Sequence, residues 1–88
     1  DTMLSVECQI VGRDDGTNSA GYKLVATFND SAGTLTQVGS TTVLATHETQ
    51  AAWDTTMDAN SGSVRVLVTG AAATTIDWRT RCVIAEGP

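Results

Sequence analysis

The 88-residue sequence holds few of the residues that carry chemistry in enzymes and metalloproteins. It has one histidine, one proline and two cysteines, and only five lysines and arginines against ten acidic residues. A net charge of −5 without a basic cluster argues against nucleic-acid binding, which needs a basic surface patch. No apolar run approaches the roughly 20 residues that cross a bilayer, so membrane insertion is not expected either.

The sequence also lacks a catalytic constellation. A histidine acts as a general base only beside an oriented partner and a nucleophile, and the Glu48 that follows His47 would point to the other face of a strand. None of the six serines lies in a Gly-x-Ser-x-Gly elbow. Residues 58–62 and 14–18 begin like calcium loops, but hairpin turns use the same residue types. We therefore expect no catalytic residue, no metal site and no cofactor.

What the chain does contain is alternation of apolar and polar residues between short turn-forming segments. Its fifteen threonines favour strands because the β-branch suits a pleated surface. This pattern predicts one all-β domain over residues 1–88, with antiparallel strands in a two-sheet sandwich of jelly-roll or immunoglobulin-like type, or a small barrel. A helix over residues 44–53 is the alternative, which Thr46 and Thr49 disfavour. The seven expected strands are residues 3–12, 20–29, 34–38, 41–47, 51–58, 63–69 and 76–85.

The apolar residues that share one face of these strands form the expected core. A core position is the stronger interpretation for both tryptophans, although an exposed aromatic face could stack on a sugar. The expected core residues are Val6, Tyr22, Leu24, Phe28, Trp53, Val64, Val66, Val68, Ile76 and Trp78.

The two cysteines lie near opposite ends of the chain, each on the apolar face of its strand. First and last strands are often neighbours in small β folds, and an antiparallel pair would let Cys8 and Cys82 form a disulfide. A domain this small gains much from such a link. The alternative is two free, buried cysteines that act as small apolar residues. Their separation does not fit a zinc site.

Residues 66–70 (VLVTG), a small loop and residues 75–79 (TIDWR) together resemble a module at the ends of tail-fibre and other structural proteins of tailed bacteriophages and prophages. Residues 22–24, 38–40 and 52–54 are similar to it as well, so the likeness covers residues 4–85. The resemblance implies a non-enzymatic β-sandwich of the virion, displayed extracellularly on a fibre, spike or tube. It implies a homo-oligomer, expected to be a trimer. Its tasks would be self-association and contact with a host receptor or cell-surface glycan. The paired cysteines depart from the module, where aliphatic residues are usual.

Two further functions stay open. One is a carbohydrate-binding module, which an exposed Trp53 ring would favour and a buried ring would not. The other is an accessory β domain of a larger secreted protein. For self-association or receptor contact, the expected surfaces are the loops at residues 13–19, 29–33 and 70–75. The outward-facing Arg79 and Arg81 could pair with an acid such as Glu7 or with a neighbouring subunit. The loop residues are Asp14, Asp15, Asn18, Asn29, Asp30, Ala71, Ala72 and Ala73.

Overall fold

The computed structural model describes residues 1–72 and 74–88, and every regular element in them is a β-strand. The expected all-β class and the antiparallel pairing are confirmed. The alternating pattern produces long strands because one side of each can be buried while the other meets water. The strands are β1 (Thr2–Asp14), β2 (Ser19–Ser31), β3 (Thr34–Glu48), β4 (Asp54–Asn60), β5 (Ser63–Thr69) and β6 (Ile76–Gly87).

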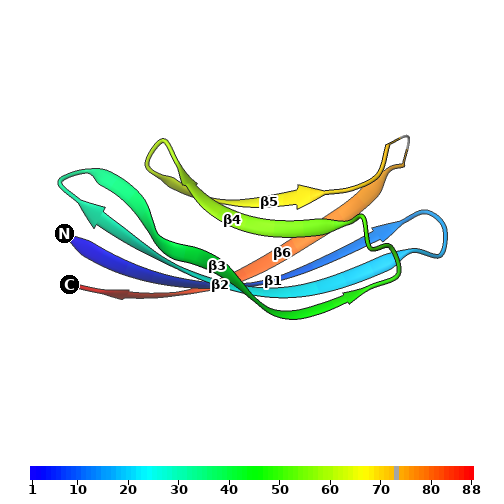
Figure 1. The fold of residues 1–88 in the computed structure, drawn as a ribbon, viewed down its shortest axis with the longest axis horizontal. Helices are drawn as coiled ribbons and strands as arrows, with labels where there is room; N and C mark the ends of the chain where they lie inside the picture. The colour runs from blue at the N-terminus through cyan, green and yellow to red at the C-terminus, as the bar shows by residue number, and fades with distance from the viewer. Residues whose placement is uncertain (73) are drawn as a thin grey trace.

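The strands form two sheets. The larger has the order β3-β2-β1-β6, and the smaller is the β4–β5 hairpin, which lies over one face of the curved larger sheet (Figure 1). The molecule is long, at 46 × 22 × 18 Å, because β1, β2 and β3 run most of its length. The expected barrel is wrong, since the described strands close no barrel, and six strands arranged as four plus two differ from the seven or eight of immunoglobulin-like and jelly-roll folds.

The strand count differs from expectation at β3. Residues 34–38 and 41–47 were expected as separate strands, with Gly39 and Ser40 between them. Gly39 does adopt a positive φ of 72°, but the register of β3 on β2 shifts there and the strand continues. The glycine therefore makes a bulge in one strand rather than a turn between two. The alternative helix over residues 44–53 is wrong, because residues 44–48 belong to β3.

Two hairpin turns are built alike. Ala32 and Gly33 join β2 to β3, and Ser61 and Gly62 join β4 to β5, each as a two-residue loop. All four have φ between 51° and 83°. Two positive φ values in succession are typical of a type I′ turn, whose twist matches that of the flanking strands. The spacing over residues 58–62 that begins like a calcium loop is therefore used here as a turn.

The core lies between the β4–β5 hairpin and the covered face of the larger sheet. Val6, Tyr22, Leu24, Phe28 and Trp53 are buried, joined by Cys8, Ile10 and Met57. Four further expected core residues, Val64, Val66, Ile76 and Trp78, are half-buried and pack against that cluster.

Val68 does not join the core, because its residue is 42% exposed. It lies near the end of β5, which is an edge strand of the two-stranded sheet and has a neighbouring strand on one side only. The same alternation that buries part of Val66 therefore leaves Val68 in contact with solvent.

Candidate functional site

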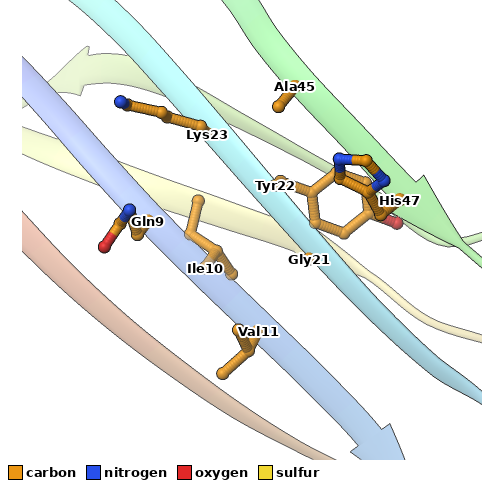
Figure 2. Close-up of a pocket in the computed structure, with 8 residues that line it drawn as sticks. All are labelled: Gln9, Ile10, Val11, Gly21, Tyr22, Lys23, Ala45 and His47. Carbon is orange, nitrogen blue, oxygen red and sulfur yellow. The ribbon is translucent and has the colours of Figure 1, made fainter.

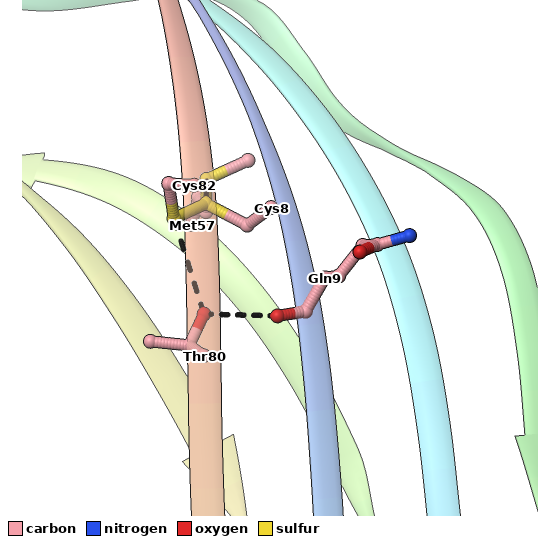
Figure 3. The surroundings of a disulfide bond; sticks show 5 residues. All are labelled: Cys8, Gln9, Met57, Thr80 and Cys82. Atoms are coloured by element: carbon pink, nitrogen blue, oxygen red, sulfur yellow. Dashed lines mark hydrogen bonds between the residues drawn. A yellow bond between two sulfur atoms is a disulfide. The ribbon is translucent and has the colours of Figure 1, made fainter.

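The disulfide between Cys8 and Cys82 is confirmed, and the alternative of two free cysteines is wrong. The two residues are direct cross-strand partners in the β1–β6 register, with Cα atoms 4.1 Å apart. The Met57 Sδ lies 3.6 Å from the Cys8 Sγ, so β4 covers the bond from the core side (Figure 3). Beside it, the Thr80 hydroxyl donates to the backbone carbonyl of Gln9. The disulfide thus fixes the edge strand β6 to the centre of the sheet.

The C-terminal half of β6 is open on both faces. Val83, on the outer face, is 64% exposed, and Ile84, on the face that carries the core, is 59% exposed. The cause is visible in Figure 1, where this end of β6 extends beyond the β4–β5 layer. Within the part of the chain that the structure describes, β6 pairs only with β1, so its other edge also meets solvent. The segment between Arg81 and Glu86 carries no charge.

The other edge of the large sheet, β3, also exposes apolar side chains. Val38, Val43 and Leu44 are 50%, 50% and 52% exposed. Register shifts opposite Lys23/Leu24 and Val25/Thr27 interrupt its pairing with β2. Bulges of this kind twist an edge away from a regular ladder and protect it from further pairing. The two edges thus share apolar character but differ in regularity.

The loop between β1 and β2 is organised by the Asp14 carboxylate. Its Oδ1 accepts hydrogen bonds from the backbone N–H groups of Gly16 at 2.8 Å and Asn18 at 3.1 Å, and its Oδ2 accepts one from the Asn18 side chain at 2.9 Å. The hydrogen bond from the Asn18 side chain is the main reason that the pKa of Asp14 lies below its ordinary value. The carboxylate therefore holds the loop together, while the next residue, Asp15, is exposed.

The remaining expected contact residues lie in varied places. Asn29 and Asp30 belong to β2 and are half-buried, so the loop expected at residues 29–33 is only the two-residue turn described above. Ala71 and Ala72 are exposed in the β5–β6 connection, and Ala73 lies outside the described residues. Of the two outward arginines, Arg79 pairs with Asp77, and Glu7 pairs with Lys23 at 3.0 Å rather than with an arginine.

A shallow hollow of about 340 Å³ lies on the outer face of the large sheet, above Gly21 (Figure 2). Gly21 stands between its cross-strand neighbours Val11 and His47, and a Cβ added there would meet no atom within 4 Å. The hollow exists because the glycine lacks a side chain between two larger ones. Its lining is mostly apolar, with Lys23 and Gln9 at one side.

On the opposite face, the Tyr22 hydroxyl donates a hydrogen bond to the Glu48 Oε2 at 2.5 Å. Burial, and then the hydrogen bond and negative charge of Glu48, raise the pKa of Tyr22 far above its ordinary value of 10. The Glu48 carboxylate therefore accepts a hydrogen bond from the neutral phenol of Tyr22 and does not orient His47. This pair anchors the end of β3 against the core.

Both tryptophans lie in the aromatic part of the core rather than on an open surface. Trp53 is 2% exposed, and its ring meets that of half-buried Trp78 edge-on, with centroids 5.7 Å apart. Tyr22 also packs near Trp78, at a centroid distance of 6.4 Å. The face of Trp53 is therefore closed to a sugar.

Two further observations concern residues 1–72 and 74–88. No group of three or more His, Cys, Asp or Glu side chains among them is placed to hold a metal ion. They also contain no helix of the length and apolar character that would cross a membrane.

Sequence reasoning missed the open half of β6 and the hollow at Gly21. The signal for the first is the consecutive apolar run CVIA at residues 82–85, which breaks the alternation of a half-buried strand. The signal for the second would be a glycine inside a predicted strand, which marks close approach or missing packing.

Comparison of this chain with protein-family models, with curated proteins and with solved structures finds no match.

Proposed function

We propose that this protein is a non-enzymatic structural module that associates with further copies of itself through the β6 edge of its large sheet. The observation that carries the proposal is the exposure of the apolar side chains of Val83 and Ile84 on the edge strand β6. Edge strands are the usual place of unwanted pairing, and proteins that stay monomeric protect them with charges, bulges or covering segments. The C-terminal half of β6 has none of these protections between Arg81 and Glu86.

Side-chain links between neighbouring strands of both sheets suit such a role. A disulfide links β6 to β1, and a bidentate ion pair between Arg65 and Asp58 joins β4 to β5, with contacts of 2.9 and 2.8 Å. A strand held in one geometry loses less conformational entropy when it binds a partner. The elongated shape also leaves long edges relative to the small core.

The resemblance to tail-fibre and related virion proteins of bacteriophages suggests where such a module would work. On that proposal it is an extracellular part of a virion fibre, spike or tube, and its loops contact a host receptor or glycan. The alternative carbohydrate-binding module is less favoured, because Trp53 is buried and cannot offer its ring to a sugar.

Sedimentation velocity over a wide range of protein concentration tests the proposal. We expect a reversible homo-oligomer whose fraction rises with concentration, and association that weakens when the disulfide is reduced. A chain that stays monomeric at every concentration would contradict self-association, and a monomer that also binds immobilised glycans would favour the carbohydrate-binding alternative.

A further inference from the structure

The backbone of β6 presents a defined set of free hydrogen-bonding groups. Antiparallel pairs alternate between hydrogen-bonded pairs, with Cα atoms about 5.5 Å apart, and non-hydrogen-bonded pairs at about 4.5 Å. The Cys8–Cys82 separation of 4.1 Å identifies this as a non-hydrogen-bonded pair. The N–H and C=O of Cys82 therefore point away from β1, as do those of every second residue along β6. Thr80, Cys82, Ile84 and Glu86 thus offer donors and acceptors to the open edge.

The side chains around this edge are suited to a second strand. Val83 extends the outer face of the sheet and Ile84 the core face, and both are more than half exposed. A strand laid against β6 would cover apolar surface on both faces while pairing the free backbone groups. The opposite edge, β3, cannot offer a similar ladder, because its register shifts twice along its length.

Charge favours one direction for a contact between two copies of β6. Neither Arg81 nor Glu86 forms an ion pair with any residue that the structure describes. In an antiparallel β6–β6 contact centred on Val83, the Arg81 side chain of each copy lies on the outer face opposite the second copy's uncharged Ala85, and Glu86 lies on the core face, so no like charges meet. A parallel contact would instead place like charges side by side, which is unfavourable.

We propose that two copies of this chain pair their β6 strands antiparallel about a two-fold axis, with Val83 of one copy opposite Val83 of the other. This register keeps core-face residues opposite core-face residues, as continuous pleating requires. It sets Ile84 against the second copy's Cys82, and Thr80 against its Glu86. The two four-stranded sheets become one sheet of eight strands. The contact is isologous, so the complex is an even-numbered assembly rather than the trimer that the resemblance implies.

This inference rests on the proposed self-association and names its contact. A contact made by one strand pair with few apolar side chains is small for a specific interface. Stable interfaces bury roughly 1,200 Å² or more of accessible surface. We therefore expect a reversible dimer whose affinity is sensitive to one side chain. The fixed position of β6, linked to β1 through Cys82, makes the edge ready to pair.

The test compares Val83→Lys with Leu44→Lys, a control of similar exposure on the β3 edge. Because the two-fold axis sets position 83 against itself, Val83→Lys places two like charges in contact. It should raise the dimer dissociation constant at least tenfold, as measured by sedimentation equilibrium, while Leu44→Lys changes it less than twofold. Circular dichroism of both variants verifies that the β fold is kept.

A cross-link gives a second measurement that does not depend on weakening the contact. Directly opposite residues in a non-hydrogen-bonded pair have the Cα spacing that a disulfide accepts. Val83→Cys should therefore form a covalent dimer under mild oxidation, and Leu44→Cys should not. Peptide mapping would identify the 83–83 link and the intact Cys8–Cys82 bond.

The possible failures can be told apart. A wild-type chain that is monomeric at all concentrations overturns both the proposed function and this contact. An oligomer that is a trimer, or one that Val83→Lys leaves intact, keeps self-association but overturns the β6–β6 contact. Equal cross-linking of Val83→Cys and Leu44→Cys would also overturn it.

Discussion

The indole of Trp78 lies directly against the backbone of Gly12, its cross-strand partner on β1. A Cβ built on Gly12 would come within 2.6 Å of the Trp78 Cε3 and Cζ3 atoms. Only glycine permits this approach, which lets Trp78 reach both Trp53 and Tyr22. The start of β6 is therefore held against the core by ring packing, and its later part by the disulfide.

Replacing Gly12 with alanine should destabilise the fold, because the added methyl forces the Trp78 ring out of its packing position. Overpacking of this kind costs about 1–3 kcal/mol. Gly21→Ala is the matched control on the neighbouring strand, since its Cβ would enter open space. Urea unfolding measures both variants. A Gly12→Ala midpoint equal to that of Gly21→Ala would contradict the account of Trp78.

Removing the disulfide should lower the free energy of unfolding by about 2–5 kcal/mol, the usual cost in a small domain. The bond joins residues 74 positions apart, so its loss frees almost the whole unfolded chain. A Cys8→Ala/Cys82→Ala double variant avoids leaving a thiol. Reductant should lower the urea midpoint of the wild type and leave that of the double variant unchanged. A reductant effect of equal size on both would argue against the bond as the cause.

Tyr22 should make stability depend on pH in the alkaline range. Its pKa is raised in the folded state above the ordinary value of 10, so the unfolded chain loses the phenolic proton first as pH rises. The contribution of Tyr22 to stability is therefore complete below pH 10 and declines above it. The stability difference between wild type and Tyr22→Phe should shrink between pH 9 and pH 11, whereas a difference independent of pH would show that the phenol titrates normally in the fold.

Asp14 should produce the opposite dependence in acid. Hydrogen bonds from Asn18 and Gly16 lower the pKa of its carboxyl below the ordinary 3.8, so the folded state binds its proton less readily than the unfolded state. Its contribution is present above pH 3.8 and is lost as pH falls through the lower, folded-state pKa. Asp14→Ala should therefore be less stable than wild type at pH 6, and the difference should shrink as the pH falls below 3.8. Asp15→Ala, altered at an exposed neighbour, is the control.

The fold could be predicted well from residues at which the alternation of apolar and polar side chains agrees with their burial. Alternation along β1 placed Val6 and Cys8 on one face, and the same reasoning brought Cys82 to the matching face of β6. Gly39 was misread because a positive φ serves a bulge as well as a turn, and only the pairing with β2 distinguishes them. A period of two also shows which side chains share a face without showing what covers that face. Ile84 shares the core face with buried Val6, its cross-strand partner, yet remains exposed because the β4–β5 layer ends before it.

Hydrogen exchange of the β6 amides, resolved by NMR at increasing protein concentration, tests the self-association at this edge most directly. The amides of Arg81, Val83 and Ala85 face β1 and should be protected throughout. Those of Cys82, Ile84 and Glu86 face the open edge, and we expect them to exchange rapidly in dilute protein and to become protected as concentration rises. Rapid exchange of these three amides at every concentration would contradict pairing through β6.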